Sequence, residues 1–148
     1  MKILICSDSH RRLDLFQKVI EKEVPQIVLF TGDHSMDAID MSLIYNEIQF
    51  FIVKGNTDFI DYETPDKLIL ELEGKKIMLV HGHLFGVKSY MQKLEEEAEK
   101  EGVDVCFFGH THISYYKKVK EILYVNPGAL QNGKYAVWEK DKINMKNL

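Results

Sequence analysis

The chain has 148 residues, of which 45% are hydrophobic and 28% are charged, and this composition suits one domain with a packed core. Nineteen basic residues against 23 acidic residues give a net charge of −4, which disfavours proteins that bind nucleic acid or membrane surfaces through basic patches. No apolar run approaches the roughly 18 residues that a membrane-spanning helix needs.

The first half of the chain predicts buried strands that alternate with helices. The strands are expected at 2–6, 27–30 and 49–53. Fully apolar strands of this kind are typical of a parallel sheet covered on both faces. Between them, helices are predicted over 12–23 and over 35–46, the second with Ser35 as its N-cap. This order favours an α/β fold, in which functional sites lie at the carboxyl ends of the strands.

The second half predicts a hairpin, a helix and further strands. The hairpin is formed by residues 67–72, which alternate between apolar and polar, and by an apolar run over 76–80. A helix over 87–101 then precedes a buried strand over 103–108. Antiparallel strands are expected at 114–119, 121–125, 134–139 and 142–145, with turns at 126–128 and 132–133.

The cysteines and the first residues favour a cytoplasmic protein. Cys6 and Cys106 both lie in predicted core strands, so we expect reduced, packed thiols and no disulfide. Met1-Lys2 leads directly into an apolar run that is too short for a signal peptide. We expect residues 1–148 to form a single domain.

Side chains that can bind metal ions follow each predicted buried strand. His110 and His112 come just after strand 103–108, and alternate residues of an extended segment point to the same side. Imidazole is the commonest protein ligand for a transition metal. The other candidates at strand ends are Asp8, His10, Asp33, Asn56 and His81. All six histidines of the chain lie in these turns, which favours one shared site over scattered structural histidines.

The number and type of these candidates predict a centre with two metals. Seven candidate ligands are more than one tetrahedral zinc uses. A carboxylate can bridge two metals about 3.5–4 Å apart, which together form a hydrolytic centre. Imidazole, carboxylate and amide ligands suit Mn, Fe, Zn or Co better than Ca or Mg. Such a centre lowers the pKa of a bound water and neutralises phosphoryl oxygens, so the predicted chemistry is hydrolysis of phosphate esters.

Five motifs of the chain resemble those of the calcineurin-like metallophosphoesterases, and most closely their small single-domain branch, the YfcE-type phosphodiesterases. The motifs are Asp8-Ser9-His10, Gly32-Asp33, Gly55-Asn56, His81-Gly82-His83 and Gly109-His110-Thr111-His112. The resemblance covers nearly the whole chain and implies an α/β fold, a four-layer αββα sandwich of two mixed β-sheets flanked by helices. It also implies a phosphodiesterase that hydrolyses small phosphodiesters by attack of a metal-bridging hydroxide.

The resemblance gives each motif residue a place in a centre of two divalent transition-metal ions per chain, with Mn expected first and Ni, Co, Zn or Fe as alternatives. The implied ligands are Asp8, His10 and His112 for the first metal, Asn56, His81 and His110 for the second, and Asp33 as the bridge. By the same resemblance Asp33, Asn56 and His81 form the catalytic set.

The chain departs from the larger family members at Thr57. They carry there a histidine that assists the leaving group, and the small branch commonly has Cys, whereas threonine is no general acid near neutral pH. This predicts a slow enzyme or one suited to good leaving groups. His34 and His83 either contact the substrate phosphate or replace the missing acid, or they hold ligand loops by hydrogen bonds. Arg11 either reaches the phosphate or faces solvent at a helix start. Together these positions give a set of candidate substrate-binding residues, namely Arg11, His34, Thr57 and His83.

Other functions remain open at this point. The same centre could hydrolyse phosphomonoesters. The family fold also serves as a protein-interaction scaffold in a retromer subunit, although seven intact candidate ligands favour an enzyme over a weak metal-binding scaffold. A structural zinc site is disfavoured because neither cysteine lies near the histidines. The acidic charge balance disfavours nucleic acid as a substrate, and exposed antiparallel strand edges would allow a homodimer.

Overall fold

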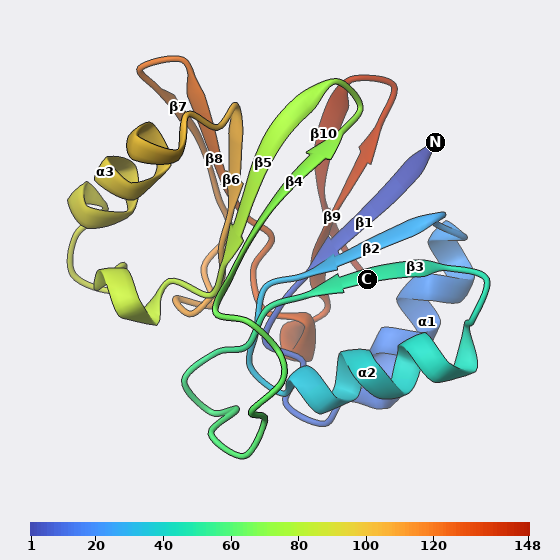
Figure 1. Cartoon of the computed structure of the whole chain (residues 1–148). Helices are drawn as coiled ribbons and strands as arrows, with labels where there is room; N and C mark the ends of the chain where they lie inside the picture. Colours follow the sequence, from blue (N-terminus) through green and yellow to red (C-terminus); the bar gives the residue numbers. More distant parts are fainter.

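A computed structural model describes all residues 1–148 and shows two five-stranded sheets packed face to face (Figure 1). The first sheet has the order β10-β9-β1-β2-β3. Its strands are β1 (Lys2–Cys6), β2 (Ile27–Phe30), β3 (Gln49–Ile52), β9 (Lys134–Glu139) and β10 (Lys142–Asn147). The three N-terminal strands run parallel, whereas β9 pairs antiparallel with β1 and β10 antiparallel with β9.

The second sheet has the order β4-β5-β6-β8-β7. Its strands are β4 (Lys67–Leu72), β5 (Lys75–Val80), β6 (Val105–Phe107), β7 (Tyr115–Val119) and β8 (Ile122–Asn126). The central strands β5, β6 and β8 run parallel, and the edge strands β4 and β7 pair antiparallel with their neighbours. Both sheets are therefore mixed, as the family resemblance implied.

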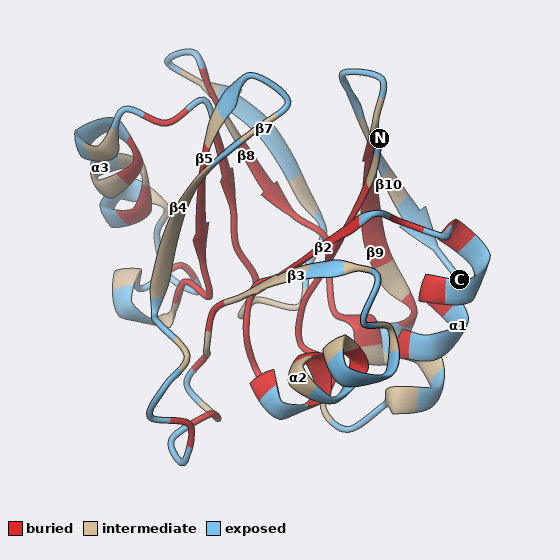
Figure 2. Cartoon of the chain, turned by 45° about the vertical axis from the view of Figure 1, so that its right-hand side comes forward, coloured by how far each residue is buried: buried red, intermediate tan, exposed pale blue.

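Helices cover the outer face of each sheet. The helices α1 (Leu13–Glu23) and α2 (Ser35–Ile44) pack on the first sheet, and α3 (Gln92–Glu101) packs on the second. A third buried cluster, which includes Ile5, Leu79 and Trp138, fills the space between the sheets (Figure 2). These four layers confirm the expected αββα sandwich. None of the helices has the length and apolar content needed to cross a membrane.

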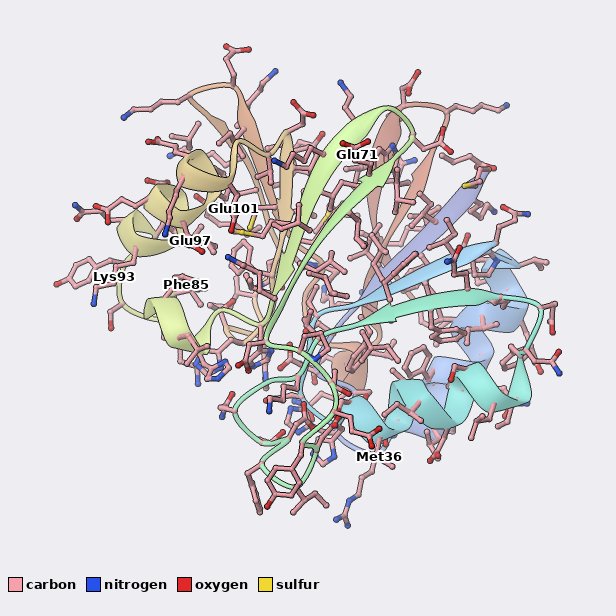
Figure 3. All side chains as sticks on the ribbon, viewed as in Figure 1. Met36, Glu71, Phe85, Lys93, Glu97 and Glu101 are labelled. Atoms are coloured by element: carbon pink, nitrogen blue, oxygen red, sulfur yellow. The ribbon has the colours of Figure 1, made fainter.

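The helix α3 is also joined to the edge of its sheet by ion pairs. Figure 3 shows Glu97 and Glu101 between α3 and the strands. The ammonium group of Lys67, at the start of β4, lies 2.7 Å from Glu97 Oε2 and also pairs with Glu101. These contacts place the hairpin β4–β5 beside α3.

The predicted helix over 87–101 begins too early. The chain forms a short 3₁₀ segment over His83–Phe85, and α3 starts only at Gln92. Gly86 has a φ of +64°, which ends the 3₁₀ segment, and Val87 packs its side chain against Gly82 and does not enter a helix. A second short 3₁₀ segment covers Leu130–Asn132.

The prediction of Ser35 as an N-cap is also wrong. His34 occupies the N-cap position with a φ of +67°, and Ser35 is the first helical residue. The Ser35 N–H donates to Asp58 Oδ1 at 2.9 Å, and its hydroxyl donates to Asp61 Oδ2 at 2.6 Å. Carboxylates from the loop between β3 and β4 therefore satisfy the start of α2 in place of a local side-chain cap.

The two cysteines are buried and unpaired, as expected. Cys6 lies in the cluster beneath α1 and α2, and Cys106 lies in the cluster beneath α3. The two thiols thus lie in different layers of the sandwich, and burial raises the pKa of each well above its usual range.

A buried carboxylate ties α1 to the edge of the first sheet. Glu23, the last residue of α1, accepts a 2.6 Å hydrogen bond from the hydroxyl of Tyr135, and Lys146 Nζ lies 3.2 Å away. Lys2 Nζ approaches the same carboxylate at 3.5 Å. Burial opposes the ionisation of Glu23, but these hydrogen bonds and charges outweigh it and hold its pKa below the usual range.

Replacing Tyr135 by phenylalanine is expected to lower the free energy of unfolding by about 1–2 kcal/mol at pH 7, because the Glu23 carboxylate loses a buried donor. A carboxylate whose pKa is lowered by folding stabilises the protein at pH values above its pKa in the unfolded state, which is about 4.3 for glutamate. That stabilisation is lost as the pH falls through the pKa of the folded state. Urea unfolding of both proteins should therefore show that the unfolding free energies of the unmodified chain and of Tyr135→Phe differ less at pH 3 than at pH 7. Tyr90→Phe, at an exposed tyrosine, is the matched control.

Candidate metal centre

Every predicted ligand lies at one end of the sandwich. The carboxyl ends of four strands, β1, β2, β5 and β6, meet there with the loop after β3. Asp8 and His10 follow β1, Asp33 follows β2, and Asn56 follows β3, all in the first sheet. The remaining predicted ligands, His81, His110 and His112, follow strands β5 and β6 of the second sheet. The candidate site thus draws its side chains from both sheets.

One group of side chains surrounds the Asp8 carboxylate. Ligand atoms of Asp8, His10, Asp33 and His112 all lie within 4.8 Å of one another. His112 Nε2 is 3.2 Å from Asp8 Oδ1, and His10 Nε2 is 3.9 Å from the same oxygen. We call these four residues the first ligand group.

A second group surrounds the Nε2 atom of His81. This nitrogen lies 3.1 Å from Asn56 Oδ1, 3.2 Å from His110 Nδ1 and 3.3 Å from Asp33 Oδ1. The other carboxylate oxygen of Asp33, Oδ2, lies 3.8 Å from His10 Nε2 in the first group. Asp33 therefore turns one oxygen to each group. We call Asn56, His81, His110 and Asp33 the second ligand group.

The six imidazole rings divide in the same way. His10 has the rings of His34 and His112 at centroid distances of 4.8 and 5.3 Å. The rings of His81 and His110 are 4.9 Å apart, and His83 lies 5.4 Å from His81 and 6.2 Å from His110. All six histidines thus gather at this end of the molecule, as their positions in the sequence indicated.

The backbone of the site is held in a conformation that L-residues rarely adopt. Positive φ angles between 45° and 70° occur at Asp8, His10, Asp33, His34, His110 and His112. Each such residue costs about 1–2 kcal/mol relative to an ordinary conformation. Such strain persists only where the surrounding structure enforces it, so these turns are held firmly by their neighbours, as a preformed site would need.

Two glycines allow the turns to approach one another. A Cβ atom on Gly55 would lie 2.7 Å from the backbone nitrogen of Asp33, and one on Gly109 would lie 2.7 Å from Asp8 Oδ2. Both distances are shorter than real Cβ contacts. Glycine before Asn56 and before His110 is therefore required for close approach of the ligand turns.

Hydrogen bonds fix which atoms face the centre. The Nδ1 atom of His81 lies 2.8 Å from the carbonyl oxygen of Thr31, so Nδ1 keeps its proton and Nε2 is the nitrogen that would lose its proton to bind a metal. Asp8 Oδ2 accepts hydrogen bonds from the Ser7 hydroxyl and the His110 N–H. Asp8 Oδ1 and His10 Nε2 are buried and have no hydrogen-bond partner. Unpartnered buried ligand atoms that point at one another fit a bound cation.

The charges of the site are those of a cation-binding centre. Burial opposes the charge on Asp33, yet hydrogen bonds from His81 and from the Thr57 N–H hold its pKa well below its usual range. Burial likewise opposes the imidazolium of His81, but the Asp33 and Asp8 carboxylates together raise its pKa. The pKa of His110 is lowered to about 4, mainly by burial and then by the charges of His81 and Lys88. Its ring is therefore neutral and able to act as a ligand.

Three positioning residues were missed by the sequence analysis. Asp58 accepts hydrogen bonds from the backbone of Asp33 and Gly55, and Asn126 donates to the Gly109 carbonyl and the Thr111 hydroxyl. The side-chain amide of Gln131 lies 3.3 Å from His112 Nδ1 and so orients that ring. Only Asn126 gave a signal in the sequence, as part of the expected turn 126–128.

The four predicted substrate-binding residues lie in different surroundings. His34 and His83 flank the first and second ligand groups, and Thr57 donates its N–H to Asp33 Oδ1 at 3.1 Å. The Nδ1 atom of His83 is buried and has no hydrogen-bond partner. Arg11 is exposed, and its backbone N–H donates to Asp37.

Comparison with known sequences gives a family match over nearly the whole chain. The family model described as "Calcineurin-like phosphoesterase superfamily domain" matches residues 1–140. The chain is similar to the Bacillus subtilis protein named "Probable metallophosphoesterase YsnB", with 32% identity over 88% of this chain and 76% of that protein. It is also similar to "Phosphodiesterase YfcE" of Escherichia coli K12, with 26% identity over 88% of this chain and 79% of that protein.

Solved structures agree with the fold. A crystal structure of an uncharacterized protein described as a predicted phosphoesterase, from Streptococcus pneumoniae TIGR4, superposes with a TM-score of 0.83 at 30% identity, covering 99% of this chain and 88% of that one. Vacuolar protein sorting 29 from Cryptosporidium parvum has a TM-score of 0.75 at 18% identity, covering 98% of this chain and 95% of that one. At that identity the second likeness shows the fold alone.

Proposed function

Because the chain belongs to the calcineurin-like phosphoesterase superfamily, we propose that its two ligand groups bind two divalent transition-metal ions and that the centre hydrolyses small phosphodiesters. The observation that carries this proposal is the orientation of Asp33, whose two carboxylate oxygens face different ligand groups. A carboxylate so placed lets two dications lie close together at tolerable repulsion. The Escherichia coli relative named phosphodiesterase supports the choice of diesters.

The residues divide between the two ions as follows. Asp8, His10 and His112 would hold the first ion, Asn56, His81 and His110 would hold the second, and Asp33 would contact both. Imidazole, carboxylate and amide together suit Mn, Fe, Co, Ni or Zn, and Mn is the ion we propose to test first. When bound, such a pair of ions supplies a water of lowered pKa and neutralises the charge of a phosphoryl group.

The chain's own residues hold this centre in one arrangement. The Thr31 carbonyl fixes the tautomer of His81, so that its Nε2 points to Asn56 and Asp33. The amide of Gln131 orients His112 toward Asp8. Preorganised ligands of this kind reduce the rearrangement needed when a phosphate group enters.

The structure supplies no strong acid at position 57 for the leaving group. Thr57 Oγ1 is buried without a hydrogen-bond partner, and a threonine hydroxyl does not donate a proton near neutral pH. The departing oxygen therefore has to leave as an anion, or accept a proton from His34 or His83. We propose that the enzyme favours diesters with good leaving groups.

The proposed function predicts metal-dependent hydrolysis of bis(p-nitrophenyl) phosphate. Protein stripped by a chelator should be inactive and should recover turnover when reloaded with Mn²⁺, with the recovery reaching its maximum at about two ions per chain. The monoester p-nitrophenyl phosphate serves as the comparison and is expected to be the poorer substrate. Faster turnover of the monoester would make the protein a phosphomonoesterase. Bound metal without turnover of either ester would favour the scaffold function.

Substituting Thr57 by histidine is expected to raise hydrolysis of diesters with alkyl leaving groups by about tenfold or more, since a positioned general acid contributes roughly 10²–10⁴-fold. Turnover of p-nitrophenyl esters should change little, because p-nitrophenolate needs no proton to leave. The ratio of the two rates is the measurement. In the same assay His34→Ala and His83→Ala test the remaining candidates, and equal losses on both esters would exclude an acid role for that histidine.

A further inference from the structure

A hollow lies beside the metal centre and is lined mostly by apolar side chains. Its volume is about 390 Å³, which is in the usual range for a small-molecule pocket. The lining residues are Val87, Lys88, Met91, Phe108, Thr111, Ile113 and Tyr115. We call this hollow the side groove. Ile113 at its rim is 70% exposed.

The side groove is built onto the turns that carry the metal ligands. Thr111, which lies between His110 and His112 in the chain, is part of its lining. Val87 packs directly against Gly82, the residue after His81, where a Cβ would come within 2.8 Å of Val87 Cγ2. The Thr111 hydroxyl accepts hydrogen bonds from the Ile113 N–H and the Asn126 amide, which fix this wall of the groove.

The charge of the side groove complements a phosphate ester. Lys88 is its only charged lining residue, and the same lining contains Thr111, which lies between the predicted ligands His110 and His112. A ligand that fits both regions therefore carries an anionic group toward Lys88 and the metal centre and an uncharged, flat group along Met91, Ile113 and Tyr115. Aromatic rings gain contact area and sulfur–aromatic contacts in such surroundings.

We propose that the side groove binds an aromatic substituent of the diester, the one that stays on phosphorus when the leaving group departs, and that Met91 and Ile113 determine this specificity. The inference rests on the proposed function of the metal centre. The leaving group departs in line with the attacking oxygen. A substituent in the side groove instead stays beside the ligand turns, since Thr111 belongs to the turn that carries His110 and His112 and also lines the groove. Substrates of this class are aryl or nucleoside esters of a second alcohol or phenol.

The kinetic test keeps the leaving group constant and varies the other substituent. The substrates are the p-nitrophenyl ester of thymidine 5′-phosphate, p-nitrophenyl phenyl phosphate and methyl p-nitrophenyl phosphate. The Mn²⁺-loaded protein is expected to have a higher kcat/KM for the first two than for the methyl ester. Ile113→Ala and Met91→Ala should reduce that selectivity about tenfold, mainly through KM, because each removes buried apolar contact with the ring. Ile44→Ala, at another exposed isoleucine on α2, is the matched control and should keep the selectivity.

A binding measurement separates failure of the groove from failure of the catalytic function. In Zn²⁺-loaded protein, phenylphosphonate should shift the methyl NMR signals of Met91 and Ile113, and methylphosphonate should leave them in place. These shifts without any hydrolysis would leave the groove as a ligand site and overturn the proposed activity. Two results would overturn the proposed role of the side groove. One is hydrolysis with no preference for aromatic substituents, and the other is an equal loss of kcat/KM on all three esters in the two variants.

Discussion

Replacing Asp33 by asparagine is expected to reduce Mn²⁺-dependent hydrolysis of bis(p-nitrophenyl) phosphate by on the order of a thousandfold while the protein stays folded. The carboxylate has one oxygen 3.3 Å from His81 Nε2 and the other 3.8 Å from His10 Nε2, so it faces both ligand groups. Asparagine keeps the shape and can still accept the Thr57 N–H. It removes the negative charge that offsets the repulsion between two dications.

The measurement is the steady-state rate at saturating Mn²⁺, together with the number of ions bound per chain by mass spectrometry under native conditions. Asp33→Asn should bind fewer ions than the unmodified chain. Asp40→Asn, at an exposed aspartate on α2, is the control for loss of one negative charge and should keep full activity. Full activity in Asp33→Asn would contradict the central place of this carboxylate.

Replacing Asp58 by alanine is expected to destabilise the fold by about 3 kcal/mol and to weaken metal binding. Its buried carboxylate accepts backbone N–H groups of Asp33 at 3.1 Å, Ser35 at 2.9 Å and Gly55 at 2.8 Å. Alanine would leave three buried donors without partners, and each unsatisfied group costs about 1–3 kcal/mol before water enters. The turns that hold Asp33 and Asn56 would then separate.

Urea unfolding of the metal-free protein measures the stability effect without any contribution from bound ions. Asp58→Asn keeps one acceptor oxygen and should lie between the alanine variant and the unmodified chain. Asp66→Ala removes an exposed aspartate from the same loop and should change stability by less than about 0.5 kcal/mol. Equal stability of the Asp58 and Asp66 variants would refute the role given to Asp58.

The elements with a strong local signal were predictable from the sequence. Strands β1, β2 and β4 have the predicted bounds because uninterrupted or alternating apolar runs leave one way to bury them. The gathering of the histidines also followed from the sequence, since the carboxyl ends of parallel strands meet at one edge. The ligand roles of these residues remain proposals.

Features that depend on distant parts of the chain could not be predicted. The two C-terminal hairpins look alike in sequence, but β8 joins the second sheet beside β6, and β9 returns to the first sheet beside β1. The segment 87–91 precedes α3 without joining it, and Val87 packs against Gly82, which lies in the turn after β5. The roles of Asp58 and Gln131 likewise arise from contacts between different loops, which no periodicity in the sequence reports.

Because each ligand group combines residues from both sheets, metal binding would also act as a cross-link between the two halves of the sandwich. An ion that binds only the folded chain stabilises it by RT ln(1 + [L]/Kd), which is about 2.7 kcal/mol at a free concentration one hundred times Kd. That energy opposes separation of the sheets, so a metal-loaded chain would open less often and be cleaved more slowly by proteases. The supply of metal would thereby set how long each molecule survives as well as whether it is active.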